Sequence, residues 1–368
     1  MLKDAADLIA EPLTVIINAS LRQAKVPSDW KVARIIPLLK KGSARDMDNY
    51  RSIFILSSVS KLLERTIHSQ MVHYLQEHKL LNPYQCGFSK GYLTEFAGLS
   101  FADTVRRNID LRQLTGAVFV DLRKAFDTVD HTILLQKLSA LGVIDHGNNW
   151  FNDYLSGRSQ VVNFNGALSD HKQTTVGVPQ GSILGPLLFV LYVKDLPDTI
   201  RHCNILLYAD DTVLFTSSDD ASSIMEKLND ELKVLDYWLR MSGLFLNTSK
   251  TETFLFGTQA RLNTVQNFTI QKNGYVLKRV FEFKYLDVVF DQHISWNAHV
   301  KYLLAKAGKR VGMLGRIRHN LTTHCANIVY TSYIRPILDY CDTVYHCCGE
   351  LNSNYLEKLQ RRSLQKVF

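Results

Sequence analysis

Two adjacent carboxylates inside an apolar stretch are the residues of this chain best suited to do chemistry. Asp210 and Asp211 lie within residues 205–215, which are otherwise mostly apolar, so we expect two buried strands joined by a tight acidic turn. Asp121 ends the apolar run 117–120, which is typical of a core strand. Buried carboxylates need neutralisation, and three of them at neighbouring strand ends would hold two Mg²⁺ ions for in-line phosphoryl transfer. In the alternative interpretation, Asp210 and Asp211 only fill a turn, where aspartate is common.

The hydrophobic periodicity of the rest of the chain predicts the elements that must position these acids. The expected helices cover residues 4–24, 58–81, 94–108, 128–141, 181–193 and 223–239, and helix continues from residue 299 onward. Besides the acidic hairpin, the expected strands cover residues 30–39, 117–120, 161–164, 254–256 and 285–290, with another near residue 175. The order is mixed rather than regularly alternating, which predicts an α+β fold.

The charge distribution favours a polyanionic partner. The chain has 368 residues, a formal charge of +8 and 46% hydrophobic residues, which is the composition of an ordinary globular protein with a basic surface. Between Asp291 and Asp339 there is no acidic residue. The bases in this segment are Lys301, Lys306, Lys309, Arg310, Arg316, Arg318 and Arg335. A one-sign surface of this kind suits phosphate, although a solvated helix face is the alternative.

The cysteines and apolar runs exclude several other classes. The six cysteines show no repeated CxxC spacing, so we expect reduced thiols in an intracellular protein, nuclear or cytoplasmic, and zinc binding at 346–348 is the weaker alternative. Acids at the N-terminus argue against a signal peptide. The longest apolar run, 183–193, is too short to cross a membrane, so no membrane partner is expected.

Several motifs, in the same order along the chain, resemble those of reverse transcriptases. Their residues are most similar to those of non-LTR (LINE-type, jockey-like) retrotransposons. The motifs are Asp121-Leu122-Arg123-Lys124-Ala125-Phe126-Asp127, Gly177-Val178-Pro179-Gln180-Gly181 and Tyr208-Ala209-Asp210-Asp211. The resemblance runs from residue 26 to residue 340. It implies a right-hand polymerase: an N-terminal helical extension (1–25), fingers and an α+β palm (26–290), and a basic helical thumb (291–368).

The resemblance assigns roles to the acids and to two nearby residues. Asp121 and Asp210 would ligate both metals, with Asp211 supporting the site. Lys250 is the candidate acid that protonates pyrophosphate, or else a surface lysine. Phe126 matches the aromatic ring that packs under the incoming sugar and excludes a 2′-hydroxyl, and a core phenylalanine is the alternative.

Other matched positions would meet the substrates. Gln180 and Gly181 match the loop along the nucleotide and the template. The fingers residues Lys40, Lys41 and Arg51 would meet the triphosphate, and we favour Arg51 because a guanidinium binds phosphate bidentately. Residues 285–288 resemble the primer-grip hairpin, and the helix from His299 resembles the thumb. The residues expected at primer and template are Tyr285, Leu286, Lys301, Lys309 and Arg310.

The chain also departs from the family pattern. Ser52-Ile53-Phe54 stands where Pro-Ile-Ser is usual, Ser89 and Leu93 replace Arg and Ser, and Asp287 replaces the glycine of the primer grip. No metal ligand is changed. These departures suggest a drifting copy of the element.

The expected function is therefore RNA-directed DNA synthesis with Mg²⁺, or Mn²⁺ as the alternative ion. The expected partners are an RNA template, a DNA primer or target DNA, and deoxynucleoside triphosphates. The rival is a decayed nucleic-acid-binding protein. A maturase or telomerase-like polymerase is disfavoured because the resemblance to jockey-like elements continues past residue 285. An endonuclease domain is expected in the full-length element and has no counterpart in this chain.

Overall fold

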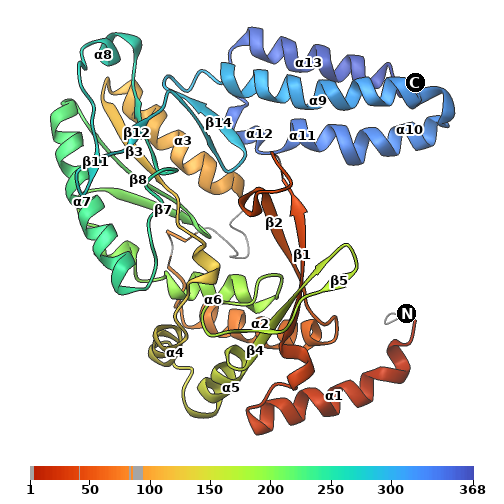
Figure 1. Cartoon of the computed structure of the whole chain (residues 1–368). Coiled ribbons are helices and arrows are strands. Elements are labelled where there is room, and N and C mark those ends of the chain that lie inside the picture. The colour runs from red at the N-terminus through yellow and green to blue at the C-terminus, as the bar shows by residue number, and fades with distance from the viewer. Residues whose placement is uncertain (1–3, 41, 83, 86–93) are drawn as a thin grey trace. The chain divides into compact units, whose positions relative to one another are not determined.

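The computed structural model describes residues 4–40, 42–82, 84–85 and 94–368 (Figure 1). The chain forms two compact units, each assembled from separate segments. Unit 1 comprises Met1–Pro83, Leu122–Pro197 and Tyr237–Phe245. Unit 2 comprises Tyr84–Asp121, Asp198–Asp236 and Leu246–Phe368. Helices and strands are mixed along the chain, so the expected α+β composition is confirmed.

Unit 2 is built on a five-stranded sheet of order β12-β9-β3-β8-β7. Its strands are β3 (Leu114–Val120), β7 (Asn204–Tyr208), β8 (Asp211–Ser218), β9 (Glu252–Phe256) and β12 (Lys278–Arg279). Strand β3 is buried along its whole length and pairs antiparallel with both β8 and β9. Because both of its faces are covered, residues 117–120 of β3 are continuously apolar rather than alternating.

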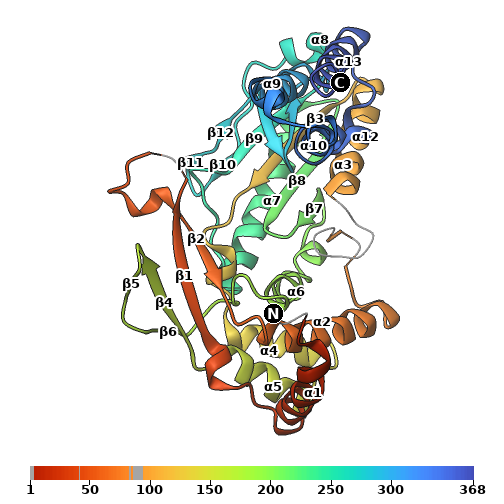
Figure 2. The ribbon, with the colours of Figure 1, turned by 90° about the vertical axis from the view of Figure 1, so that its right-hand side faces the viewer.

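Two helices cover the two faces of this sheet. Helix α3 (Thr94–Asp110) lies on one face and helix α7 (Ala221–Met241) on the other (Figures 1 and 2). On the α3 face, the ring of Phe101 packs edge-on against Phe119 and Phe215, with centroids 5.8 and 5.1 Å away. On the α7 face, a Cβ atom at Gly116 would come within 2.3 Å of Ile224, so only glycine allows this close packing.

The C-terminal part of unit 2 is helical and joins the same core. The hairpin of β13 (Glu282–Tyr285) and β14 (Val288–Asp291) leads into α9 (Asn297–Ile317), which packs against α11 and α13 (Figure 1). The further helices are α10 (Thr323–Val329), α11 (Arg335–Asp339), α12 (Asp342–Tyr345) and α13 (Glu350–Leu364). Smaller elements of unit 2 are α8 (Gln259–Asn263), β10 (Gln271–Lys272) and β11 (Tyr275–Val276).

Unit 1 combines a second sheet with helices. The order of this sheet is β2-β1-β4-β5, with β6 also paired to β4. The strands are β1 (Val32–Leu39), β2 (Tyr50–Ile55), β4 (Arg158–Phe164), β5 (Ala167–Leu168) and β6 (Lys172–Thr174). The helices are α1 (Ala6–Gln23), α2 (Ser60–Glu77), α4 (His131–Ala140), α5 (Asp145–Leu155) and α6 (Leu184–Tyr192).

The predicted elements are found with boundary shifts, and one expectation needs correction. The strand expected over 285–290 is interrupted at Leu286 and Asp287, which have φ of 47° and 65° and form a two-residue hairpin turn. The helix expected over 4–24 is confirmed as α1, and its apolar residues are only partly covered, with Leu8 83% exposed. None of the helices in the described ranges combines the length and the apolar character needed to cross a bilayer.

Candidate active site

The acidic pair lies at the end of the predicted hairpin in unit 2. Tyr208 pairs with Asp211, so Ala209 and Asp210 form the turn between β7 and β8. Ala209 has a φ of 56°, which is uncommon for a residue other than glycine. Its backbone N–H donates to Oε1 of Gln85 at 3.3 Å, which helps to hold the turn. The expectation of two largely buried strands joined by a tight acidic turn is confirmed.

Asp121 is brought beside this turn by strand pairing. Val120 pairs with Thr212 in the antiparallel ladder of β3 and β8, so the next residue, Asp121, lies opposite Asp211. Asp121 is thus brought beside the distant pair Asp210 and Asp211, and the three acids gather at the same end of neighbouring strands of one sheet. Alternation along a strand points successive side chains to opposite faces, so Asp210 and Asp211 need not be equivalent.

Two residues that the sequence did not single out hold Asp121 in place. The side-chain amide of Asn247 donates to Oδ2 of Asp121 at 2.8 Å, and the Asn247 backbone N–H donates to the Asp121 carbonyl at 2.8 Å. The Asp121 backbone N–H donates to Oγ1 of Thr251 at 3.2 Å. Ser249 in turn donates to Oδ1 of Asn247 at 2.8 Å. The only sequence signal was their place in the polar run around Lys250.

The electrostatics of the acidic edge favour a cation. Solvent still reaches both carboxylates of the turn, yet the surrounding strands partly desolvate them. This desolvation raises the pKa of Asp210, and the neighbouring Asp121 raises it further. Desolvation and repulsion from Asp210 and Asp121 raise the pKa of Asp211 to about 6. A positive ion among the three groups would offset both effects.

The donor set fits a hard divalent cation in type. Carboxylate oxygens are the ligands that Mg²⁺ prefers, and three carboxylate residues lie at these neighbouring strand ends. Within the described ranges, no three His, Cys, Asp or Glu side chains are gathered closely enough to form a complete metal site as they stand. Ion binding would therefore require side-chain adjustment, supplied by rotamer changes of carboxylates that solvent already reaches.

Lys250 lies close in sequence to the residues that orient Asp121. Its backbone N–H donates to the Asn247 carbonyl at 3.1 Å, and its side chain is exposed. It belongs to unit 2, like the three acids. The exposed position fits both a proton donor that approaches a ligand and an ordinary surface lysine, so the acid role stays a prediction.

The predicted nucleotide-binding residues belong to unit 1. Phe126 is half-buried, and its ring stacks on Phe189 with centroids 4.5 Å apart. The side-chain amide of Gln180 donates to Oδ1 of Asp127 at 2.6 Å. Burial raises the pKa of Asp127, although this bond from Gln180 opposes the shift. The amide of Gln180 is thus oriented by a carboxylate inside the same unit.

Gly181 sits where a side chain has no room. Its φ is 77°, and a Cβ atom would lie 2.6 Å from the carbonyl oxygen of Phe54. Gln180 also lines a cavity of about 420 Å³ in unit 1 together with Phe54, Lys124 and Asp127. The loop therefore approaches strand β2 with its backbone, as a glycine allows.

The fingers residues lie at the tip of the β1–β2 hairpin of unit 1. Leu38 pairs with Arg51, and the backbone N–H of Lys40 donates to the Asn49 carbonyl at 2.8 Å. Both Lys40 and Arg51 are exposed. Lys41 lies outside the described residues. The two described bases are thus available to an anionic ligand at the open end of the hairpin.

The residues expected at the primer differ in accessibility. Tyr285 is 3% exposed and its ring packs among core aromatics, so its side chain positions the hairpin and cannot reach a nucleic acid as it stands. Leu286 is in the turn, and its carbonyl accepts a hydrogen bond from the Tyr340 hydroxyl at 3.0 Å. Tyr285 is buried because side chains alternate along β13 and those of every second residue face the core.

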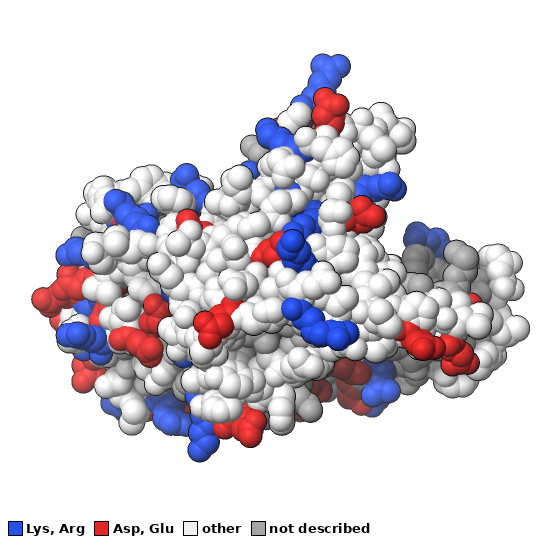
Figure 3. Space-filling model, turned by 90° about the horizontal axis from the view of Figure 1, so that it is seen from below, with Lys and Arg blue, Asp and Glu red and all other residues white. Residues whose placement is uncertain are grey.

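The predicted thumb bases lie on α9. Lys301 and Lys309 are exposed, and the guanidinium of Arg310 stacks over the ring of Tyr333 at 3.9 Å. Lys309 and Arg310 line a cavity of about 500 Å³. By contrast, the face seen in Figure 3 carries Lys and Arg mixed with Asp and Glu. The one-sign segment 292–338 remains the best candidate in the sequence for a phosphate-binding surface.

Comparisons with known proteins agree with the motifs. The model of the family described as "Reverse transcriptase (RNA-dependent DNA polymerase)" matches residues 38–303. A probable RNA-directed DNA polymerase from transposon BS of Drosophila melanogaster is 29% identical over 96% of this chain and 40% of the relative. The polymerase from mobile element jockey of Drosophila funebris is 27% identical over 96% of this chain and 39% of the relative. The chain thus spans about 40% of the length of these relatives.

A solved structure was also matched. An apo telomerase from Candida tropicalis, truncated from its C-terminal domain, aligns with a TM-score of 0.45 and 15% identity. The alignment covers 72% of this chain and 56% of that one.

Proposed function

The chain belongs to the reverse transcriptase family, and we propose that it is an RNA-directed DNA polymerase of a jockey-like non-LTR retrotransposon. It would extend a primer 3′-hydroxyl with deoxynucleoside triphosphates on an RNA template. One observation carries this proposal: Asp121, Asp210 and Asp211 gather at one edge of the unit 2 sheet. The α+β fold of a right-hand polymerase, expected from the motifs, agrees with this family.

The acidic edge is the proposed metal site. Asp121 and Asp210 would hold two Mg²⁺ ions, or Mn²⁺ as the alternative, with Asp211 supporting them. Bound there, the ions would supply the positive charge that activates the primer hydroxyl and stabilises pyrophosphate. Asn247 fixes one oxygen of Asp121, so that the carboxylate is presented in one orientation. Lys250 would give a proton to the leaving pyrophosphate.

The nucleotide would be bound by the unit 1 residues. Phe126, braced by Phe189, would exclude a ribose 2′-hydroxyl by occupying its space. Gln180 and Gly181 would lie along the nucleotide and the template. The exposed Lys40 and Arg51, together with Lys41, would contact the triphosphate through charge-assisted hydrogen bonds.

The nucleic acid would be bound by the basic helical part. We assign residues 26–290 to fingers and palm and 291–368 to a thumb that contacts primer and template through Lys301, Lys309 and Arg310, with 1–25 as an extension. RNA, DNA and nucleotides occur together inside cells, so we place the protein in the nucleus or the cytoplasm. The endonuclease expected in the full-length element would be a further partner.

A second candidate function is nucleic-acid binding without synthesis. The observation that favours it is Asp287, a carboxylate held between two lysines of the proposed primer-binding region. The intact acids Asp121, Asp210 and Asp211 favour the polymerase, because a pure binder has no need of three converging carboxylates.

Primer extension on an RNA template separates the two candidates. The wild-type chain is expected to extend a DNA primer in Mg²⁺, and Asp210→Asn is expected to abolish extension while leaving binding of the primer–template largely intact. The matched control is Asp170→Asn, which removes an exposed acid from a loop of unit 1. Equal extension by the wild type and Asp210→Asn, or extension by neither with intact binding, would contradict the polymerase proposal.

A further inference from the structure

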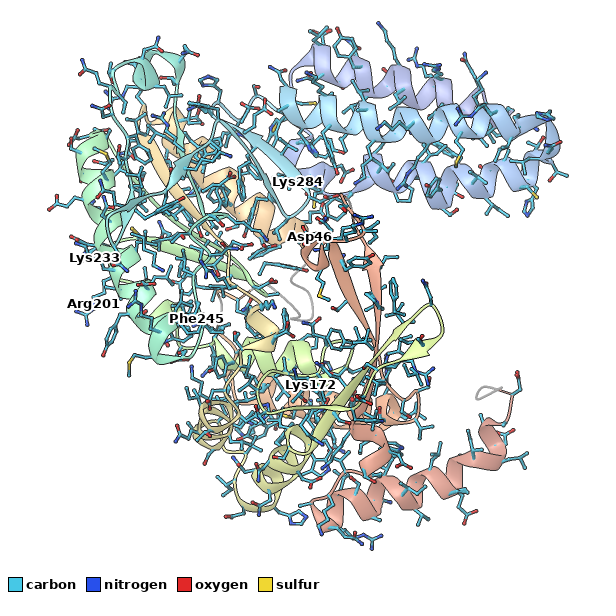
Figure 4. All side chains as sticks on the ribbon, viewed as in Figure 1. Asp46, Lys172, Arg201, Lys233, Phe245 and Lys284 are labelled. Atoms are coloured by element: carbon cyan, nitrogen blue, oxygen red, sulfur yellow. The ribbon has the colours of Figure 1, made fainter. Side chains whose placement is uncertain are left out.

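A compact network of charges joins the β13–β14 turn to helix α9. The carboxylate of Asp287 forms ion pairs with Lys284 through Oδ1 and with Lys306 through Oδ2, the latter at 3.0 Å. The hydroxyl oxygen of Tyr302 accepts from Nζ of Lys284 at 3.1 Å and of Lys306 at 3.0 Å. Figure 4 labels Lys284 on its strand next to the start of this turn. One carboxylate thus has two ammonium groups as partners.

This network is accessible rather than part of the core. The side chain of Asp287 is 41% exposed and that of Lys306 is 35% exposed. Asp287, Tyr302, Lys306 and Arg310 line a cavity of about 210 Å³. Three of these residues also line the neighbouring cavity that contains Lys309. A ligand that reaches either cavity would meet the network directly.

The lining of both cavities has the chemistry of a nucleic-acid surface, with one exception. Lys306, Lys309 and Arg310 supply positive charge, and the tyrosine rings beside them offer stacking surfaces. Among the described residues that line the two cavities, Asp287 is the only acidic one. A negative charge at this place would repel phosphates that the other residues attract.

The carboxylate of Asp287 is ionised, so it carries the negative charge that the rest of the lining lacks. Partial burial favours the neutral acid and acts to raise the pKa of Asp287. The hydrogen bonds from Lys284 and Lys306 outweigh this effect and lower the pKa below its usual value. The group is therefore charged at neutral pH. Asp287 has two lysine ammonium groups and the Tyr302 hydroxyl around it, which is a set of partners that a phosphate oxygen would also accept.

We propose that the Asp287 carboxylate occupies the place of a nucleic-acid phosphate between Lys284 and Lys306, and thereby weakens primer–template binding by unit 2 and reduces its salt dependence. This inference rests on the proposed function and deepens it. While the two lysines remain paired to Asp287, they release no counterions on binding, so the salt slope is smaller than the basic surface would otherwise give.

The variant Asp287→Asn tests this role without disturbing the turn. Residues 286 and 287 both have positive φ, and asparagine adopts the left-handed conformation readily. Asp287→Gly is a second variant, since glycine also suits the turn. The matched control is Asp339→Asn, which removes the same charge from an exposed ion pair with Arg335, at 2.8 Å, in the same unit. Neither Asp339 nor Arg335 lines the two cavities.

The experiment measures the affinity of the full chain for a labelled RNA–DNA primer–template by fluorescence anisotropy at several salt concentrations. Asp287→Asn and Asp287→Gly are expected to bind about three- to tenfold more tightly near 0.15 M salt. Their slope of log K against log salt should be steeper by about 1 to 2, because two lysines become free to contact phosphates. Asp339→Asn should stay close to the wild type.

The contrary outcomes are distinct. Equal affinity and slope for all four proteins would overturn the inference and leave the proposed function intact. Weaker binding by Asp287→Asn would also overturn it, because the carboxylate would then be ordering the lysines for the ligand. An equal gain in affinity for Asp339→Asn would show that the loss of any negative charge explains the effect, and this too would overturn the inference. If none of the proteins binds primer–template, the proposed function fails, and the inference fails with it.

Discussion

The side-chain amide of Asn247 donates a hydrogen bond of 2.8 Å to Oδ2 of Asp121, across 126 residues of sequence. The same asparagine uses its backbone N–H to bond the Asp121 carbonyl at 2.8 Å. Its own side-chain oxygen accepts from Ser249 at 2.8 Å. One residue thus fixes both the backbone and the carboxylate of the acid that begins the proposed metal site, and leaves the other carboxylate oxygen for a ligand.

Asn247→Ala is therefore expected to impair catalysis without removing any proposed metal ligand. Freed from the amide, the Asp121 carboxylate can rotate away from the orientation that a metal requires. Partners of this kind typically contribute about 10- to 100-fold in activity or metal affinity. Primer extension at increasing Mg²⁺ should show a lower maximal rate and a higher Mg²⁺ requirement. Ser249→Ala, which only loosens Asn247, should have a smaller effect, and an unchanged Mg²⁺ dependence in Asn247→Ala would contradict this role.

Gly181 and Gly166 form a matched pair for testing the Gln180–Gly181 loop. Both have positive φ, 77° and 89°, but only at Gly181 would a Cβ atom meet another group, the Phe54 carbonyl oxygen at 2.6 Å. Gly166→Ala should cost about 1 kcal/mol of unfolding free energy from backbone strain alone. Gly181→Ala should cost about 1–3 kcal/mol more, since the loop must also move away from Phe54. Urea denaturation of the two variants measures the difference, and equal losses would refute the steric reason.

The sequence predicted those features whose signal is local. The acidic turn follows from apolar runs on either side of Asp210 and Asp211, and the buried face of α9 follows from the helical spacing of residues such as Val300 and Val311. The extent to which α1 is covered could not be predicted. An amphipathic pattern indicates which side of a helix is apolar, but not whether another element packs against that side.

Other features depend on contacts between distant segments or on weak local signals. Asn247 was missed because its partner, Asp121, is far away in sequence, and a polar run such as 247–251 does not show which of its residues bonds to a distant acid. The periodicity of residues 285–290 predicted a single strand, because Leu-Asp lacks the Asn-Gly signature of such turns, and only the family resemblance implied the hairpin. In both cases tertiary packing decided what local propensity left open.

The proposed role of Phe126, whose ring stacks on Phe189, is to exclude ribonucleotides, and this role can be tested by substitution. Phe126→Val should leave space for a 2′-hydroxyl, because the smaller side chain no longer fills the position that Phe189 braces at 4.5 Å. The ratio of kcat/KM for ribonucleotides to that for deoxynucleotides should rise by about 10- to 100-fold. If Phe126 is only a core residue, both values should fall together and the ratio should stay unchanged. Single-nucleotide incorporation with matched dNTP and rNTP distinguishes these outcomes.

The buried imidazole of His299 should make the stability of unit 2 depend on pH. The side chain is fully buried, and its Nδ1 accepts from the backbone N–H of Val289 at 3.2 Å. Burial lowers the pKa of His299 to about 4, and the charges of Lys306 and Lys284 act in the same direction against Asp287. The folded chain therefore keeps this imidazole neutral at a pH where the unfolded chain protonates it.

Because the folded pKa lies below the unfolded value of about 6.5, the full stability is present above that pH and is lost as the pH falls toward 4. Between pH 7.5 and 4, the contribution of His299 should fall by roughly 3 kcal/mol, at about 1.4 kcal/mol per pKa unit. His299→Gln keeps an acceptor for Val289 but cannot be protonated, so its unfolding free energy should decrease less over the same range. Urea denaturation at pH 7.5, 5.5 and 4 measures both proteins, and parallel pH profiles would show that His299 does not cause the loss.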